Sequence, residues 1–126
     1  MPTYSPGEVA DKTGFSLDTL RYYERIGLLD DIARTAGGQR VFTDDDVSWL
    51  GILRCLRDTG MPITLMRRYG RLCQDESTLP DRIALIDEHA RSVAAQIAEL
   101  QVQQDRLASK AEWYRGELAR RAARAS

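Results

Sequence analysis

One set of polar side chains in this sequence recurs at the spacing of a helix. A helix turns about 100° per residue, so residues three and four apart share a face. One face would carry Asp18, Arg21, Tyr22 and Arg25, and the other side would carry Leu17, Leu20 and Tyr23. We expect the apolar side to pack against a core and the charged side to meet a ligand.

A second candidate for chemistry is Cys55, which stands between Arg54 and Arg57. A thiol close to guanidinium groups ionises readily, and the thiolate is the form that attacks an electrophile. The alternative is that Cys55 packs as a small apolar side chain on the core face of its helix. Cys73 is a weaker candidate by the same test.

The residue types in this sequence give little support to a catalytic site or a metal site. An enzyme needs an acid, base or nucleophile in one constellation, whereas this chain has one histidine, His89, scattered carboxylates and no glycine-rich phosphate loop. No cysteine follows Cys73, His89 has no second ligand nearby in sequence, and the clustered cysteines of an iron–sulfur site are missing. We therefore expect no catalytic residue, no metal and no cofactor.

The charged face requires a short helix, and the surrounding residues predict two. Ser5 and Glu8 have the spacing of a capping box for a first helix, which is expected to stop by Gly14. Ser16 is the expected N-cap of a second helix that runs to about Ile26. Two short helices joined by a tight glycine-containing turn predict a helix-turn-helix.

The next segments predict a hairpin and two further helices. Residues 32–42 hold paired glycines between two short runs, which indicates a β-hairpin, and a hairpin after a helix-turn-helix is a wing. Thr43 and the three aspartates after it predict the start of a third helix that ends near Arg57. Pro62 opens a fourth helix through Cys73, and a polar loop follows.

A long heptad pattern fills the second half of the chain. Eleven positions, apolar except for Gln104, alternate steps of three and four at Ile83, Ile86, Ala90, Val93, Ile97, Leu100, Gln104, Leu107, Ala111, Tyr114 and Leu118. Residues 80–118 are therefore predicted to form one coiled-coil helix about 55 to 60 Å long. Its stripe is too long to bury against the preceding head, so we expect a partner chain and a homodimer. Residues 119–126 are expected to form a flexible tail.

Composition supports a folded chain without a strongly charged character. Hydrophobic residues make up 43% and charged residues 29%, and the net charge is −1. No apolar run approaches the roughly 18 residues that span a bilayer, and Glu8 and Asp11 stand where a signal peptide would be apolar. We expect a cytoplasmic protein without a membrane partner, in which both cysteines are free thiols.

Taken in order, these residues resemble the MerR family of bacterial transcription regulators. The similarity is carried by Gly7–Ala10, Thr13–Gly14, Thr19–Leu29, Gly38–Thr43, Asp46 and Leu53–Gly60. It implies a mainly α fold: a winged helix-turn-helix DNA-binding domain over residues 1–75, with a short β-hairpin wing, and then a long C-terminal helix that dimerises as an antiparallel coiled coil. It also implies a homodimeric regulator that binds a palindromic promoter operator and distorts the DNA for RNA polymerase.

The resemblance assigns DNA contacts position by position. Arg21 and Tyr22 match groove-facing residues, where arginine pairs with guanine edges, and Arg40 matches a wing arginine that binds phosphate. The remaining predicted contacts to double-stranded DNA are Ser16, Asp18, Thr19, Arg25, Gln39, Arg54 and Arg57.

The sequence departs from the family pattern at two places. The wing usually contains Gly-Tyr-Arg, whereas Gln39 stands here between Gly38 and Arg40, so an aromatic contact is missing. Asp30 and Asp31 stand where prolines are common, close to the expected phosphate surface. Both departures from the family pattern are expected to weaken the affinity for DNA or to change it in some other way.

The expected signal is open between several alternatives. The segment Leu53–Met61 resembles the aldehyde- and nitrosative-stress branch of the family (NmlR/AdhR-like), whose sensor cysteine corresponds to Cys55. Drug-sensing relatives carry a ligand-binding domain after the coiled coil, for which we expect no room here. A ligand-independent repressor and a coiled-coil adaptor that binds only protein are the alternatives, although an adaptor leaves the head residues unexplained.

Overall fold

The computed structural model describes residues 2–126, and it is mainly helical. Contacts divide the chain into two compact units, one ending at Leu85 and one running from Ile86 to Ser126. No helix within residues 2–126 has the length and apolar character needed to cross a membrane.

The first two helices begin and end where the capping residues predict. Helix α1 spans Pro6–Thr13, and α2 spans Leu17–Arg25. Ser5 and Glu8 form the capping box of α1, and Gly14 ends it in the left-handed conformation, with φ of 77°. The Ser16 hydroxyl caps α2 by accepting a hydrogen bond from the Thr19 amide at 3.1 Å. The predicted helix-turn-helix is confirmed.

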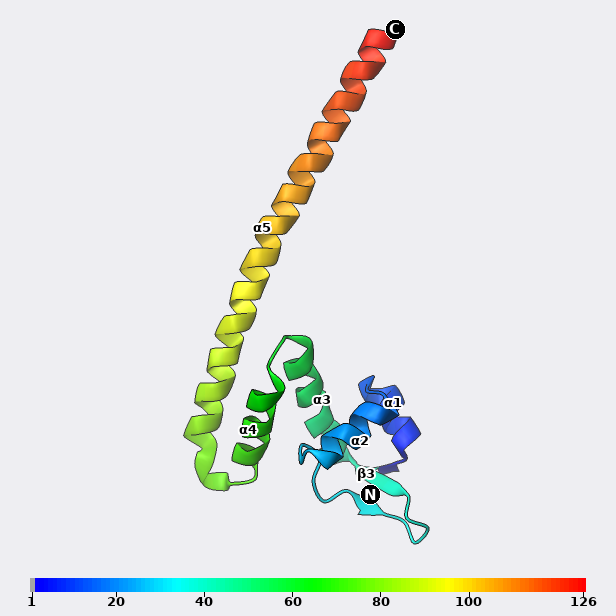
Figure 1. The fold of residues 1–126 in the computed structure, drawn as a ribbon, viewed down its shortest axis with the longest axis vertical. Helices are drawn as coiled ribbons and strands as arrows, with labels where there is room; N and C mark the ends of the chain where they lie inside the picture. The colour runs from blue at the N-terminus through cyan, green and yellow to red at the C-terminus, as the bar shows by residue number, and fades with distance from the viewer. Residues whose placement is uncertain (1) are drawn as a thin grey trace. The chain divides into compact units, whose positions relative to one another are not determined.

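A small antiparallel sheet forms the predicted wing and adds one strand. Strand β2 (Ala33–Arg34) pairs with β3 (Arg40–Thr43), and β3 also pairs with β1 (Thr3–Tyr4), which gives the order β1-β3-β2 (Figure 1). The hairpin turns at Gly38, whose φ is 84°. Strand β1 was not predicted, because two residues are too few to show an alternating pattern.

Two helices complete the first unit before the long helix starts. Helix α3 spans Asp44–Asp58 and α4 spans Ile63–Cys73, and the two pack side by side (Figure 1). A capping box between Thr43 and Asp46 starts α3. The segment predicted as a loop contains a single 3-10 turn, η1, at Glu76–Thr78.

The core of the first unit gathers apolar side chains from α1, α2, β3, α3, α4 and the segments that join them. Its buried residues are Val9, Phe15, Leu20, Tyr23, Leu28, Leu29, Phe42, Leu50, Leu53, Leu56, Met61 and Met66. Leu17, expected on the packing side of α2, is 41% exposed instead. It is the first residue of α2 and lies at the helix end, whereas Leu20 and Tyr23 are further along the same side and are buried.

The long helix α5 runs from Leu79 to Ala125 over 47 residues and contains no buried residue. The helix therefore continues beyond the predicted end at 118, and residues 119–125 are helical rather than a flexible tail. The reason is local. Glu117 pairs with Arg120, Arg121 and Arg124 at 2.9, 3.2 and 3.5 Å, and the alanines between them favour a helix.

Candidate nucleic-acid interface

The outer face of α2 exposes the polar residues that its periodicity predicts. Arg21 forms an ion pair with Asp18 at 3.0 Å, and both side chains are solvent-exposed. Tyr22 is 38% exposed, and the guanidinium of Arg25 lies over its ring at 5.4 Å. Because Leu20 and Tyr23 are buried on the other side of α2, this face points toward solvent.

Two residues predicted to contact DNA, Ser16 and Thr19, form the N-terminal cap of α2. The Ser16 hydroxyl donates a hydrogen bond to the Thr19 hydroxyl at 2.9 Å while accepting from the Thr19 amide. Ser16 is exposed and Thr19 is half-buried. These two residues therefore position the start of α2, and a contact with DNA stays a prediction for both.

The wing arginines are tied to α2 by an acidic residue that sequence analysis missed. One carboxylate oxygen of Glu24 accepts a hydrogen bond from Arg40 Nε at 2.5 Å, and the other accepts from Arg34 at 2.9 Å. Arg34 also donates to the Gly38 carbonyl at 3.1 Å, and Gln39 is exposed in the same turn. The role of Glu24 could have been predicted from its position in the sequence. It is a carboxylate in the last turn of α2, where the helix dipole disfavours negative charge, so it needs cationic partners.

Arg54 and Arg57 form a network inside the first unit. Arg54 donates to the Thr13 carbonyl and to Asp58, both at 2.6 Å, and so links α1 to α3. Arg57 binds Asp58 at 3.2 Å and lies over the Phe15 ring at 4.7 Å. The hydrogen bonds from Arg54 and then Arg57 hold the pKa of Asp58 below its ordinary value of 3.8. Contact of Arg54 or Arg57 with the DNA backbone stays a prediction. Their contacts with Asp58, the Thr13 carbonyl and the Phe15 ring would compete with binding to DNA.

The two cysteines lie in different surroundings. Cys55 is exposed, so the alternative that it packs on the core face of α3 is wrong. The reason is its register: the core side of α3 carries Leu50, Leu53 and Leu56, and Cys55 is about 200° from Leu53. Cys73 is half-buried, and burial together with a hydrogen bond to Cys73 raises the pKa of Tyr69. Within residues 2–126, no group of three or more histidine, cysteine or acidic side chains has a metal-binding arrangement.

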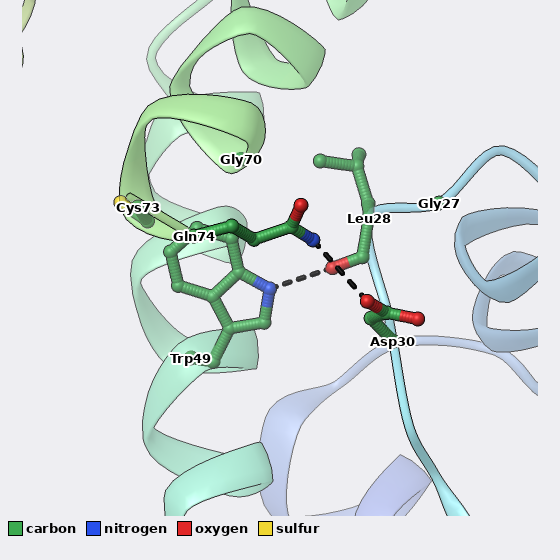
Figure 2. Close-up of a pocket in the computed structure, with 7 residues that line it drawn as sticks. All are labelled: Gly27, Leu28, Asp30, Trp49, Gly70, Cys73 and Gln74. Carbon is green, nitrogen blue, oxygen red and sulfur yellow. Dashed lines mark hydrogen bonds between the residues drawn. The ribbon is translucent and has the colours of Figure 1, made fainter. Parts of the chain in front are cut away.

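A pocket lies where α3 and α4 meet the segment after α2. Its wall is formed by Trp49, whose indole N–H donates to the Leu28 carbonyl at 2.7 Å (Figure 2). At its mouth the Gln74 amide donates to Asp30 at 3.3 Å (Figure 2). Gly70 leaves the space open, because a Cβ there would lie 3.1 Å from Leu28.

Along α5, the large apolar side chains of the heptad stripe are exposed. Ile83, Ile97, Leu100, Tyr114 and Leu118 are more than half exposed, and Leu107 reaches 72%. A single chain therefore leaves this stripe without a packing partner among the described residues.

Comparison with known proteins identifies the family. The family model for "MerR HTH family regulatory protein" matches residues 4–71. An uncharacterized HTH-type transcriptional regulator of Haemophilus influenzae is 37% identical over 113 residues, which cover 89% of this chain and 84% of that protein. The regulator AdhR of Bacillus subtilis is 32% identical over 88 residues, covering 68% of this chain and 63% of AdhR.

Solved structures agree with this family. The crystal structure of HiNmlR, a MerR family regulator lacking the sensor domain and bound to promoter DNA, matches with a TM-score of 0.77 and 37% identity, over 82% of this chain and 80% of that one. A MerR family regulator from Listeria monocytogenes matches with a TM-score of 0.80 and 35% identity, over 88% and 85%. The chain belongs to the MerR family of helix-turn-helix proteins, and it is a transcription regulator.

Proposed function

We propose that this regulator binds a palindromic promoter operator as a homodimer, with α2 in the major groove and the β2-β3 wing on the flanking backbone. The observation that carries this proposal is the exposed pair Arg21 and Tyr22 on a capped helix whose opposite side is fixed in the core. The similarity to HiNmlR, which was solved on promoter DNA, supports it.

Arg21 is the residue proposed to contact base edges. Its present partner, Asp18, is 93% exposed, and such surface ion pairs contribute little stability. The Arg21 guanidinium can therefore leave Asp18 at little cost and pair bidentately with a guanine. Tyr22 lies beside it, and its hydroxyl can donate to a phosphate or base oxygen.

Arg40 is the residue proposed to bind phosphate from the wing. Its Nε is bound to Glu24, and its two terminal nitrogens form no hydrogen bond or ion pair among residues 2–126. Those nitrogens therefore remain as donors for a phosphate oxygen while the ion pair fixes the direction of the guanidinium. Gln39, in the adjacent turn, is proposed to add a neutral contact in place of an aromatic one.

The exposed stripe of α5 supports the homodimer. Burial of Leu100, Leu107 and their neighbours against a second copy removes apolar surface from water, which is the main favourable term in association. Two heads joined in this way would meet two half-sites of a palindromic operator, and bending or untwisting the DNA between them would change the promoter that RNA polymerase reads.

Cys55 is proposed as the thiol that responds to electrophiles. In the structure both flanking arginines bind Asp58, so the proposal rests on the exposure of Cys55 on α3 rather than on those charges. Cys73 is half-buried and hydrogen-bonded to Tyr69, so it is the less accessible of the two thiols.

The proposed function is tested by selecting bound duplexes from a random pool with the full chain and then titrating the selected duplex. We expect one recurrent palindrome, saturation at one dimer per duplex, and clear preference over random DNA. Retention of no duplex, or of duplexes without a shared sequence, would contradict operator binding.

A further inference from the structure

The charges at the two ends of α5 are distributed unequally. Residues 75–88, which include η1 and the first turns of α5, contain five acidic side chains and one arginine. Residues 110–124, at the other end of the same continuous helix, contain five basic side chains and two glutamates (Figure 1). The whole chain has a net charge of −1, so this separation is a property of the two ends and does not follow from the composition.

The helix dipole explains only part of this separation. It favours acidic groups in the first turn of a helix and basic groups in the last turn, which accounts for Asp81 and Arg124. Asp87 and Glu88 lie beyond the first turn, and Arg115 lies well before the last turn, so the dipole has little effect on them. Their arrangement suits an opposite charge supplied from outside the chain.

Charged groups at both ends of α5 are available to a partner. The Glu76 carboxylate is exposed and forms no hydrogen bond or ion pair among residues 2–126. Arg121 and Arg124 each pair with Glu117, at 3.2 and 3.5 Å, and both side chains are more than two-thirds exposed. Exposed ion pairs of this kind add little stability, so both guanidinium groups can exchange Glu117 for another carboxylate at little cost.

The apolar stripe of α5 determines how a second copy meets these ends. Leu79 lies four residues before Ile83 on the stripe and is 57% exposed, and Leu118 near the other end is 71% exposed. An antiparallel pair that places Leu79 of one copy opposite Leu118 of the other matches every stripe position between them; we call this pairing the Leu79–Leu118 register. The facing residues are then Leu79 with Leu118, Ile83 with Tyr114, Ile86 with Ala111, Ala90 with Leu107, Val93 with Gln104, and Ile97 with Leu100.

The charged residues favour the same register. Arg82 and Glu117 each stand one residue before a stripe position, so they flank the stripe on the same side and face each other across an antiparallel pair. Arg121 continues the stripe one step beyond Leu118 and lies level with Glu76 of the second copy. Two contacts between opposite charges therefore form at each end, and a symmetric dimer repeats them.

Other arrangements of two copies bring like charges together. Sliding one copy by a heptad, so that Ile86 meets Leu118, places Arg82 beside Arg124 of the second copy. A parallel pair places the two basic ends side by side. Charges that flank the stripe select orientation and register in coiled coils partly by such repulsion.

We propose that the basic end of α5, residues 110–124, binds the acidic segment 75–88 of a second copy in the Leu79–Leu118 register, and that this charge clasp fixes the orientation and register of the homodimer. The inference rests on the homodimer of the proposed function and adds which residues meet. It also gives a role to the helical residues 119–125, which extend past the first residue of the second copy's α5 and carry Arg121 to its η1 turn.

The register is tested with the full chain by pulsed electron spin resonance between spin labels. Cys55→Ser and Cys73→Ser remove the native thiols, and either Ser92→Cys or Ser109→Cys supplies one exposed attachment point outside the stripe. In the proposed register the two labels of a dimer are separated along the helix axis by about 20 Å at position 92 and about 32 Å at position 109. A slide of one heptad changes each separation by about 10 Å, and a parallel pair gives short separations at both positions. Either of these results would overturn the inference.

Charge reversal tests the clasp itself through the dissociation constant of the dimer at low salt. Arg121→Glu is expected to raise this constant roughly tenfold, because each dimer then has two repulsive contacts with Glu76. Adding Glu76→Arg to Arg121→Glu should restore the wild-type constant, whereas fraying of the helix end alone would not be restored. The matched control is Arg106→Glu, which reverses an exposed charge about 200° around α5 from Gln104. At about 0.5 M KCl the effect of Arg121→Glu should largely disappear, because salt screens exposed charges.

Failure of the clasp and failure of the homodimer give different results. Equal dissociation constants for Arg121→Glu and Arg106→Glu would overturn the clasp while the wild-type chain is a dimer. A double variant that stays as weak as Arg121→Glu alone would also overturn it. A wild-type chain that is monomeric at micromolar concentration would instead defeat the homodimer of the proposed function.

Discussion

The carboxylate of Glu24 on α2 and the guanidinium of Arg40 on β3 meet at 2.5 Å, and both side chains are only about one quarter exposed. Because Arg34 binds the second carboxylate oxygen, Glu24 joins the proposed base-reading helix to both strands of the wing. Glu24 is therefore a positioning residue for the wing.

Glu24→Gln is expected to weaken operator binding, although it removes a negative charge that would repel DNA. The reason is that Arg40 loses its orientation, and we expect a loss of about tenfold, equivalent to about 1.4 kcal/mol. Equilibrium titration of the operator measures it, with Asp11→Asn as a control for the same charge change on α1. Tighter binding by Glu24→Gln would show that Glu24 acts only through repulsion.

The exposed stripe of α5 predicts where one charge breaks the homodimer. Leu100→Asp places a carboxylate on the stripe, and burying it unpaired is costly, so we expect a monomer at micromolar concentration. Ala98→Asp puts the same charge about 200° around the helix and should leave the dimer intact. Light scattering distinguishes the two states, and a monomeric wild-type chain would contradict the prediction.

The exposure of Cys55 predicts which thiol transmits an electrophile signal. Cys55→Ser is expected to keep dimerisation and operator binding but to abolish the change in transcription that a reactive aldehyde causes, whereas Cys73→Ser should retain it. In vitro transcription from the operator-bearing promoter, with and without the aldehyde, measures both. An undiminished response in Cys55→Ser would remove this role from Cys55.

The network around Asp58 predicts a pH-dependent contribution to stability. Its pKa is lowered by Arg54 and Arg57, so its stabilising effect is present above the ordinary value of 3.8 and is lost as pH falls through the lower folded value. Asp58→Asn should therefore lower the melting temperature at pH 7, and the difference from wild type should begin to shrink below pH 3.8 and disappear below the lower folded pKa. A difference that stays constant down to pH 2 would contradict this assignment.

Most helix ends and the hairpin were predictable because they depend on local chemistry. Ser5, Ser16 and Thr43 cap helices through groups three residues away, and Gly14 and Gly38 supply positive φ, so a short window of sequence contains the cause. Strand β1 was missed because its two residues form a strand only by pairing with β3, about forty residues later.

The candidate interface was less predictable because its contacts are long-range. Type and spacing identified Arg21 and Tyr22, but nothing local distinguishes Arg40, which binds Glu24, from Arg67, which binds nothing among the described residues. Similarly, Arg54 was predicted as a DNA contact from its position in the sequence, and nothing local indicated that its guanidinium also donates to the Thr13 carbonyl, 41 residues away in sequence. Partners brought together by folding decide which surface charges are available.

The most direct test of the proposed DNA-binding function compares Arg21→Ala with Arg40→Ala on the selected operator and on random DNA. Arg21→Ala should cost about 1 to 3 kcal/mol on the operator and relax preference at one base position, because it removes a base-edge contact. Arg40→Ala should weaken operator and random duplex alike and lower the salt slope by about one. Equal losses on both duplexes from both substitutions would contradict the account, because α2 would then not be the element that recognises sequence.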